Sequence, residues 1–292
     1  MAASSGGQDV VHLDGDSRVI CCGSRSLDVS RPVIMGVLNV TPDSFSDGGR
    51  FNSANDAVEH ALRMHAEGAA IIDIGGESTR PHAGEVSSEQ ELERVVPVIE
   101  ALRGRIGAVI SVDTSKPRVM REAVAAGADM INDVYALRLP GALEAAAELG
   151  AGLCLMHMQG TPRTMQANPT YDNVVAEVRD FLKERVAACL AAGIPGSALM
   201  VDPGFGFGKT LAHNLELLRG LRGLGELGLP VLAGLSRKSF VGRITGGDID
   251  NRAFGSVAFA LCAVREGASI IRVHDVKGTA DALEVWQAVY GP

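Results

Sequence analysis

The sequence predicts an α/β protein built around one parallel sheet, and three observations lead to this fold class. Short apolar runs rich in Val, Ile, Leu and Ala alternate with amphipathic segments of helical periodicity. The apolar runs are continuous, which is typical of strands that are covered on both faces. Aromatic residues make up only 4% of the 292 residues while Gly numbers 35, which favours helices packed on a sheet over an all-β sandwich. Repeated βα units over ~260 residues indicate a closed (β/α)8 TIM barrel, and a doubly wound open sheet is the alternative that the pattern leaves open.

The predicted barrel follows a leader and a short hairpin. Residues 9–32 alternate loosely between apolar and polar residues and carry turn residues at Asp14, Gly15 and Asp16, which predicts the hairpin. Eight strands are then predicted at residues 33–39, 70–75, 108–113, 129–133, 152–157, 199–203, 230–235 and 269–274. Helices are predicted between them, as at residues 57–68, 88–104, 117–127, 140–150 and 174–193, and these segments end in Gly. We therefore expect a leader and hairpin over residues 1–30 and the barrel over residues 31–292, with residues 242–255 forming a loop before the last pair of helices.

Composition excludes several classes of protein. Lys and Arg number 27 against 35 for Asp and Glu, giving a formal net charge of −8, so nucleic acid is not an expected partner. No apolar run approaches the ~18 residues that a membrane span requires, and the N-terminus lacks the basic and apolar regions of a signal peptide. The five cysteines show no CxxC spacing, which predicts reduced thiols. Together these features predict a cytoplasmic protein with no membrane partner.

Polar residues stand at the end of every predicted strand. In chain order they are Asn39, Asp73, Asp113, Asn132 with Asp133, His157, Asp202, Ser236 to Lys238, and Arg272 with His274 and Asp275. A single Asp or Asn at such a position is most simply a helix cap. A polar group at every strand end is more than capping explains, and in a barrel all these ends converge on the face that carries the active site.

The side chains expected on that face divide into two chemical groups. Asp73, Asp113, Asn132 and Asp202 offer acceptors that suit a flat heterocycle with several N–H donors. The basic side chains suit a phosphate or a carboxylate, and they are Arg80, Lys238, Arg272 and His274. The sequence therefore predicts a substrate in which a heterocycle is attached to an anion.

Two other motif readings are weaker. The segment GFGFGKT resembles a phosphate-binding loop, but that motif requires Gly where this chain has Pro203. His157 and His274 lack the close spacing of a zinc site. A Mg²⁺ ion shared between one protein oxygen and a diphosphate fits this sequence better than a zinc site, because Mg²⁺ keeps most of its waters and readily takes phosphate ligands.

A set of longer motifs now resembles a known family. They are MGVLNVTPDSFSDGG (35–49), DIGGESTRP (73–81), INDV (131–134), LMHMQGTP (155–162), DPGFGFGKT (202–210), SRKSF (236–240) and RVHDV (272–276). In this order and spacing they are similar to dihydropteroate synthase, the folate-pathway enzyme that sulfonamides inhibit. The resemblance covers roughly residues 30–290 and implies a dimeric (β/α)8 barrel. It also implies a Mg²⁺-dependent transferase that joins 6-hydroxymethyl-7,8-dihydropterin diphosphate to p-aminobenzoate, releasing diphosphate and 7,8-dihydropteroate.

The resemblance also implies a role for each matching residue. The pterin is expected on Asp73, Asp113, Asn132, Asp202 and Lys238. The diphosphate is expected on Asn39, Arg272 and His274, with Asn39 also holding the Mg²⁺. The p-aminobenzoate pocket is expected to consist of Phe45, Thr79, Pro81, Phe207 and Ser239 beside Lys238. The catalytic residues it implies are Asp47, Arg80 and Lys238, in a dissociative reaction through a carbocation-like intermediate.

A different class of function remains as an alternative. A non-catalytic pterin-binding barrel, or a folate-binding domain of a methyltransferase, would keep the pterin acceptors. Neither needs Asp47, Arg80 and the SRKS segment together, and all three are present. We therefore expect a synthase acting on small molecules, with a second copy of the chain as its protein partner.

Overall fold

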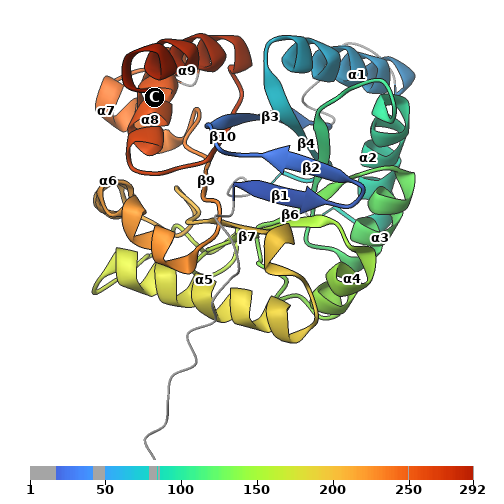
Figure 1. The fold of residues 1–292 in the computed structure, drawn as a ribbon, viewed down its shortest axis with the longest axis horizontal. Helices are drawn as coiled ribbons and strands as arrows, with labels where there is room; N and C mark the ends of the chain where they lie inside the picture. The colour runs from blue at the N-terminus through green and yellow to red at the C-terminus, as the bar shows by residue number, and fades with distance from the viewer. Residues whose placement is uncertain (1–17, 42–49, 79–83, 85, 249, 292) are drawn as a thin grey trace, which may run out of the picture.

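The computed structural model describes residues 18–41, 50–78, 84, 86–248 and 250–291, except for the side chains of residues 50–53. Within them, the strands are β1 (Val19–Cys22), β2 (Arg25–Asp28), β3 (Val33–Asn39), β4 (Ala69–Gly75), β5 (Val109–Asp113), β6 (Met130–Asp133), β7 (Gly152–Met156), β8 (Leu199–Asp202), β9 (Leu232–Ala233) and β10 (Ile270–Val273). The α-helices are α1 (Arg50–Ala66), α2 (Ser88–Leu102), α3 (Pro117–Ala126), α4 (Ala142–Leu149), α5 (Val174–Ala191), α6 (Leu211–Arg219), α7 (Ser239–Thr245), α8 (Ala253–Arg265) and α9 (Val276–Tyr290). Figure 1 shows the helices as an outer ring around the strands. The predicted α/β class is confirmed.

The sheet closes into a barrel. Its eight parallel strands follow the order β8-β7-β6-β5-β4-β3-β10-β9. Val201 of β8 pairs in parallel with Val231, next to β9, and its N–H donates to the Pro230 carbonyl at 3.0 Å. This contact joins the two ends of the sheet, so the closed barrel is confirmed and the doubly wound open sheet is excluded.

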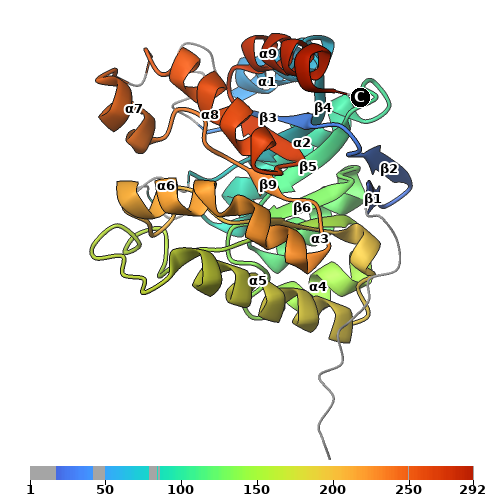
Figure 2. The same ribbon diagram turned by 60° about the vertical axis from the view of Figure 1, so that its left-hand side comes forward.

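The N-terminal hairpin covers one end of the barrel. Strands β1 and β2 pair antiparallel, and Figure 1 shows them lying across the barrel axis. Their buried side chains pack on one apolar side chain from each barrel strand, namely Met35, Ile71, Val109, Met130, Cys154, Met200, Leu232 and Ile270. The hairpin therefore seals the amino-terminal end of the strands, and Figure 2 shows it at the opposite end of the molecule from α7.

The structure bears on two predictions of local structure, the turn of the N-terminal hairpin and the loop at residues 242–255. The predicted turn at Asp14–Asp16 lies outside the described residues, and the described hairpin turns at Gly23, whose φ is +60°. Residues 242–255 are not one loop, because α7 extends to Thr245 and α8 begins at Ala253. A seven-residue helix such as α7 is too short to show a clear periodicity, and it ends at Gly246 in the left-handed conformation.

Two further sequence expectations concern the membrane and the cysteines. None of the helices in the described ranges combines the length and the apolar character needed to cross a bilayer. Each of the five cysteines has a free thiol.

Candidate active site

A polar layer lies directly above the apolar layer inside the barrel. Side chains two residues apart on a strand point to the same face. The residues two positions after Ile71, Val109, Met130, Met200 and Ile270 therefore also face the barrel interior. These residues are Asp73, Ser111, Asn132, Asp202 and Arg272. The site is thus built on the strands themselves.

Asp73 is the centre of this layer and has no exposed surface (0%). Its carboxylate accepts from Ser111 Oγ at 2.7 Å, from Asn132 Nδ2 at 3.0 Å and from Arg272 Nε at 2.7 Å. These donors come from three strands, β5, β6 and β10. A buried carboxylate with donors on both oxygens is a fixed part of the framework. Ser111 was not predicted as a site residue, although its position two residues before Asp113 would have indicated it.

Asp113 lies at the end of β5 and shares the Arg272 guanidinium with Asp73. Arg272 Nη2 donates to Asp113 Oδ2 at 2.9 Å. The pKa of Asp113 is raised to about 7, because burial and the neighbouring Asp73 raise it more than Arg272 lowers it. Arg272 keeps its charge, since the two carboxylates raise its pKa although burial lowers it. Asp113 is therefore a carboxyl group whose charge changes near neutral pH.

Lys238 and Asp202 form the other side of the barrel mouth. The Lys238 ammonium donates to the Phe205 carbonyl and lies 4.7 Å from the centre of the Phe207 ring. The pKa of Lys238 is lowered to about 8, because burial lowers it more than Asp202 raises it. Burial raises the pKa of Asp202, whose Oδ1 accepts from the Gly204 amide at 2.7 Å. A Cβ atom at Gly206 would lie only 3.0 Å from Lys238 Cδ, so the glycine leaves room for the lysine side chain.

The glycine-rich segment after β8 is a packed support and not a phosphate-binding loop. Lys209, which a phosphate-binding loop would direct at a phosphate, is 3% exposed. Its ammonium lies 2.9 Å from the Gly204 carbonyl, 3.0 Å from the Phe207 carbonyl and 2.9 Å from His157 Nδ1. A side chain at Gly204 would collide with the His157 carbonyl at 1.9 Å. Lys209 therefore holds the segment that carries Phe207, and His157 belongs to this support.

Histidine 157 is neutral in this environment. Burial and, to a smaller extent, the adjacent Lys209 lower its pKa to about 2. The other predicted histidine, His274, contacts a different group, since its Nδ1 lies 3.1 Å from Ser236 Oγ. In the described part of the chain no cluster of three or more His, Cys, Asp or Glu could hold a metal ion.

The remaining predicted residues lie at the rim or outside the described ranges. Asn39 is the last residue of β3, and its Oδ1 lies near Gly75. A Cβ atom on Gly75 would occupy the space between Asn39 and Asp113. Ser239 is exposed at the start of α7 and lines a cavity of about 140 Å³ with Gly206 and Arg243. The structure does not describe five predicted site residues, which are Phe45, Asp47, Thr79, Arg80 and Pro81.

Known proteins resemble this chain along most of its length. A family model described as "Pterin binding enzyme" matches residues 35–274. The dihydropteroate synthase of Haemophilus influenzae is 57% identical over 265 residues, covering 91% of this chain and 96% of that protein. The chain belongs to the dihydropteroate synthase family.

Solved structures of that family share the fold at similar identity. Dihydropteroate synthase from Xanthomonas albilineans in complex with 7,8-dihydropteroate is 53% identical, with a TM-score of 0.86 over 94% of this chain and 99% of that one. The Yersinia pestis enzyme with a sulfonamide drug is 52% identical, with a TM-score of 0.89 over 94% of this chain and 100% of that one. The family and the activity predicted from the motifs are confirmed. The chain is a transferase of folate biosynthesis that condenses 6-hydroxymethyl-7,8-dihydropterin diphosphate with p-aminobenzoate.

Proposed function

We propose that the polar layer of the barrel binds the pterin ring. The observation that supports this is the network around Asp73, whose Oδ2 accepts from both Asn132 and Arg272 and so fixes these two side chains. Asn132 uses its amide N–H on Asp73, which leaves its Oδ1 to accept from a ligand. The carboxylates of Asp113 and Asp202 supply further acceptors for the ring N–H groups, and Lys238 supplies a donor for its carbonyl.

The diphosphate and Mg²⁺ are assigned to the rim beside β3 and β10. Arg272 and His274 would receive the diphosphate, and Asn39 would hold the Mg²⁺. The donor set fits this ion, because one amide oxygen leaves most of its coordination to water and phosphate. The space beside Gly75 borders Asn39 and Asp113. When bound, Mg²⁺ supplies positive charge that favours departure of the diphosphate.

The second substrate is assigned to the segment beyond Lys238. Phe207 offers an aromatic face and Ser239 a hydroxyl next to the small cavity after β9. Phe45, Thr79 and Pro81 complete this pocket in the proposal. An aromatic amine between Phe207 and the pterin would lie near Lys238, where the two substrates meet.

The reaction is proposed to be dissociative. The C–O bond to diphosphate breaks with its electron pair on the oxygen, leaving a methylene cation conjugated with the dihydropterin. The amine of p-aminobenzoate then forms the C–N bond and gives up one proton. The protein contributes position and charge, with Arg272 and His274 facing the leaving group and the carboxylates near the cation. Asp47, Arg80 and Lys238 are the catalytic residues in this proposal.

Ordered binding is the first test of this assignment. If the diphosphate site helps to complete the p-aminobenzoate pocket, p-aminobenzoate binds weakly alone and about tenfold more tightly with Mg²⁺ and diphosphate present. Isothermal titration calorimetry with neither, either and both additions measures this difference. Asn39→Ala should remove the gain that depends on Mg²⁺, whereas Ser239→Ala should weaken p-aminobenzoate under every condition. Equal affinities in all four mixtures would refute the proposal.

Protonation of Asp113 provides a second test. A ligand that donates N–H groups prefers the ionised carboxylate, so pterin affinity should rise by up to about tenfold per pH unit as the pH approaches 7 and then level off. The raised pKa means that the folded state retains this proton better than the unfolded chain does. Its contribution to stability is therefore present at acidic pH and is lost as the pH rises through about 7. Asp113→Asn should remove both trends in pterin titrations and in urea unfolding. A pH dependence that survives this substitution would assign the titration to another group.

We propose that the enzyme is a homodimer in the cytoplasm. Helices α8 and α9 support the dimer, because they pack together and carry exposed large hydrophobic side chains. These are Phe254 (92% exposed), Val285 (65%), Val289 (63%) and Tyr290 (69%). Apolar surface of this kind marks interaction sites. Sedimentation equilibrium of the purified protein measures whether its mass is that of one chain or two.

A further inference from the structure

The turns after β9 and β10 carry site residues beyond the end of the backbone pairing between these two strands. Their last pair is Ile271 with Ala233. Lys238 lies further along the chain from β9, and His274 directly follows β10. The pairing of β9 with β10 therefore does not set where Lys238 lies relative to His274, and side-chain contacts take over this task.

Side chains connect the two turns in two places. The His274 N–H donates to Ser236 Oγ at 3.2 Å, and His274 Nδ1 lies 3.1 Å from the same oxygen. Arg237 forms a two-point ion pair with Asp275, in which Nε donates to Oδ2 at 3.0 Å and Nη2 donates to Oδ1 at 2.5 Å. A bidentate pair of this kind fixes the orientation of its partners as well as their distance. The turn that carries Lys238 is therefore fixed against the turn that carries His274.

Arg237 has a backbone conformation that glycine adopts more readily than any other residue. Its φ is +56°, which costs free energy in a residue with a Cβ atom. The start of α8 fixes this conformation, since the Arg237 N–H donates to Ser256 Oγ at 2.9 Å and the Arg237 carbonyl accepts from Arg252 Nη1 at 3.0 Å. Strain persists where surrounding contacts over-determine a conformation, and it is concentrated at functional sites.

Asp275 does not play the usual role of its position. It is the N-cap of α9, where an aspartate side chain commonly accepts from its own helix. Asp275 makes no such hydrogen bond, because both of its carboxylate oxygens accept from Arg237. Two local preferences are therefore overridden at this pair, the cap of α9 and the backbone of Arg237.

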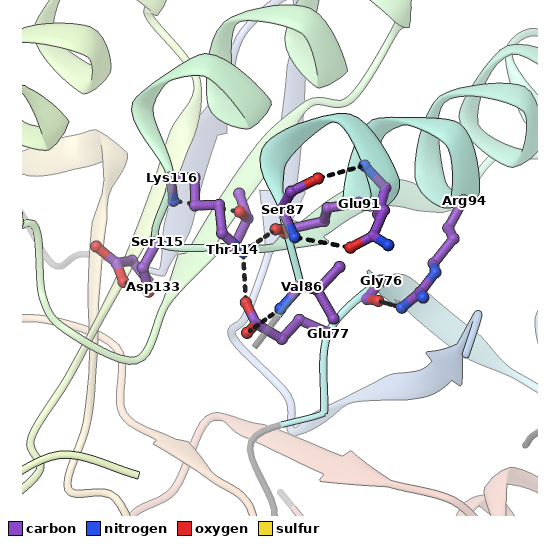
Figure 3. A network of polar contacts seen from close by, with 11 residues as sticks. Gly76, Glu77, Val86, Ser87, Glu91, Arg94, Thr114, Ser115, Lys116 and Asp133 are labelled. Atoms are coloured by element: carbon purple, nitrogen blue, oxygen red, sulfur yellow. Dashed lines mark hydrogen bonds and ion pairs between the residues drawn. The ribbon is translucent and has the colours of Figure 1, made fainter. Parts of the chain in front are cut away.

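Neither helix packing nor ion pairing by itself requires this arrangement. Helices α7 and α8 already pack through an edge-to-face pair of phenylalanine rings whose centres are 5.4 Å apart. Figure 3 shows another ion-pair cluster, in which the Lys116 ammonium lies 2.5 Å from Glu77 Oε2, after β4, and 2.5 Å from Glu91 Oε2 of α2. The φ of Lys116 is −92°, an ordinary value. Ion pairs between neighbouring segments of this barrel thus form without strain, so the strain at Arg237 needs a different reason.

We propose that Arg237 and Asp275 are positioning residues for the pterin diphosphate, acting through the spacing that they fix between Lys238 and His274. This inference rests on the proposed roles of Lys238 at the pterin ring and His274 at the diphosphate. A substrate that spans both sites gains from their correct spacing, whereas a fragment that occupies one site does not depend on it. Neither Arg237 nor Asp275 needs to touch a substrate.

Ligand fragments test the positioning role. In Arg237→Gln and Asp275→Asn the Kd for pterin diphosphate should rise about tenfold, while the Kd values for 6-hydroxymethylpterin and for diphosphate with Mg²⁺ each change by less than about twofold. Isothermal titration calorimetry without p-aminobenzoate measures all three. Because the two residues act as one pair, the double variant should bind pterin diphosphate no more weakly than either single variant. Fragments weakened as much as the joined ligand would overturn the proposal.

Arg25→Gln is the matched control. Arg25 forms an ion pair with Asp129 at 3.4 Å, and its side chain is 34% exposed against 35% for Arg237. This pair involves the N-terminal hairpin, at the opposite end of the molecule from α7 (Figure 2). Arg25→Gln should therefore affect stability alone and leave the Kd for pterin diphosphate unchanged. A loss of affinity equal to that of Arg237→Gln would mean that binding follows stability, and the positioning role would be refuted.

A glycine variant separates positioning from stability. Arg237→Ala removes the ion pair and keeps the strain, so this variant should be less stable than the wild type. Arg237→Gly removes the strain as well, because glycine adopts a positive φ freely, and it should unfold at a higher urea concentration than Arg237→Ala. Pterin diphosphate should bind weakly to both variants. Recovery of stability and affinity together in Arg237→Gly would contradict the proposal.

The outcome is distinguishable from a failure of the proposed site. Lys238→Met and His274→Ala are measured in parallel. If neither weakens pterin diphosphate binding, the assignment of these residues to the substrate is wrong and the inference falls with it. If they weaken it while Arg237→Gln and Asp275→Asn do not, the site assignment stands and the positioning role alone is refuted.

Discussion

Replacing Arg272 with methionine is expected to lower the free energy of unfolding by about 3–5 kcal/mol, because breaking a buried ion pair leaves a charge without compensation. Asp73, which has no exposed surface, would keep only Ser111 and Asn132 as donors. The activity should fall further than stability alone explains, with kcat/KM reduced by at least about a hundredfold at a temperature where the variant is folded. Urea unfolding and initial-rate assays measure the two effects.

A control and a compensating variant make this prediction specific. Arg222→Gln removes an exposed ion pair with Glu266, in which the arginine is 68% exposed, so it should cost less than about 1 kcal/mol. Arg272→Met combined with Asp73→Asn removes the uncompensated charge and should recover part of the lost stability without recovering activity. A single Arg272→Met variant of wild-type stability would show that Asp73 is not held as a buried carboxylate.

Lys238→Met is expected to have the second-largest effect, a fall in kcat/KM of more than about tenfold, which corresponds to ~1.4 kcal/mol of transition-state stabilisation. Here stability should not fall with activity. The pKa of Lys238 in the folded state, about 8, lies below that of an ordinary lysine. Folding therefore disfavours its charged form, which lowers the free energy of unfolding. This loss of stability diminishes only as the pH rises above about 8. Near neutral pH the variant should unfold at an equal or higher urea concentration than the wild type.

Lys277→Met is the control for that prediction. Lys277 lies on α9 in an exposed pair with Asp281, so its loss should change neither kcat/KM nor the urea midpoint appreciably. Initial rates at varied concentrations of each substrate separate an effect on binding from one on the chemical step. A Lys238→Met variant with normal turnover would remove this residue from the catalytic set, and one that is strongly destabilised would indicate a structural role.

The sequence by itself determined the fold class and most of the strand-borne site. Asp73, Asp113, Asn132 and Asp202 were recognisable because each ends an apolar run, and all such ends meet on one face of a barrel. The long motifs then identified the family. These are properties of neighbouring residues along the chain, so a pattern of period two and a strand end are enough to find them.

Only the tertiary structure decided which of these groups interact. Arg272 was predicted as a strand-end cation, but its ion pair with Asp73, 199 residues earlier in the chain, was not predicted. The ion pairs of Lys116 with Glu77 and Glu91 were not predicted, since a Glu inside an amphipathic helix is expected to face solvent unless a neighbouring helix covers it. Lys209 resembled a phosphate ligand in sequence and is instead buried against carbonyl groups. The physical reason is common to all three. Which side chains interact across the barrel interior, between helices or within a folded loop depends on how the sheet closes and how its segments pack. Local periodicity carries no information about that closure.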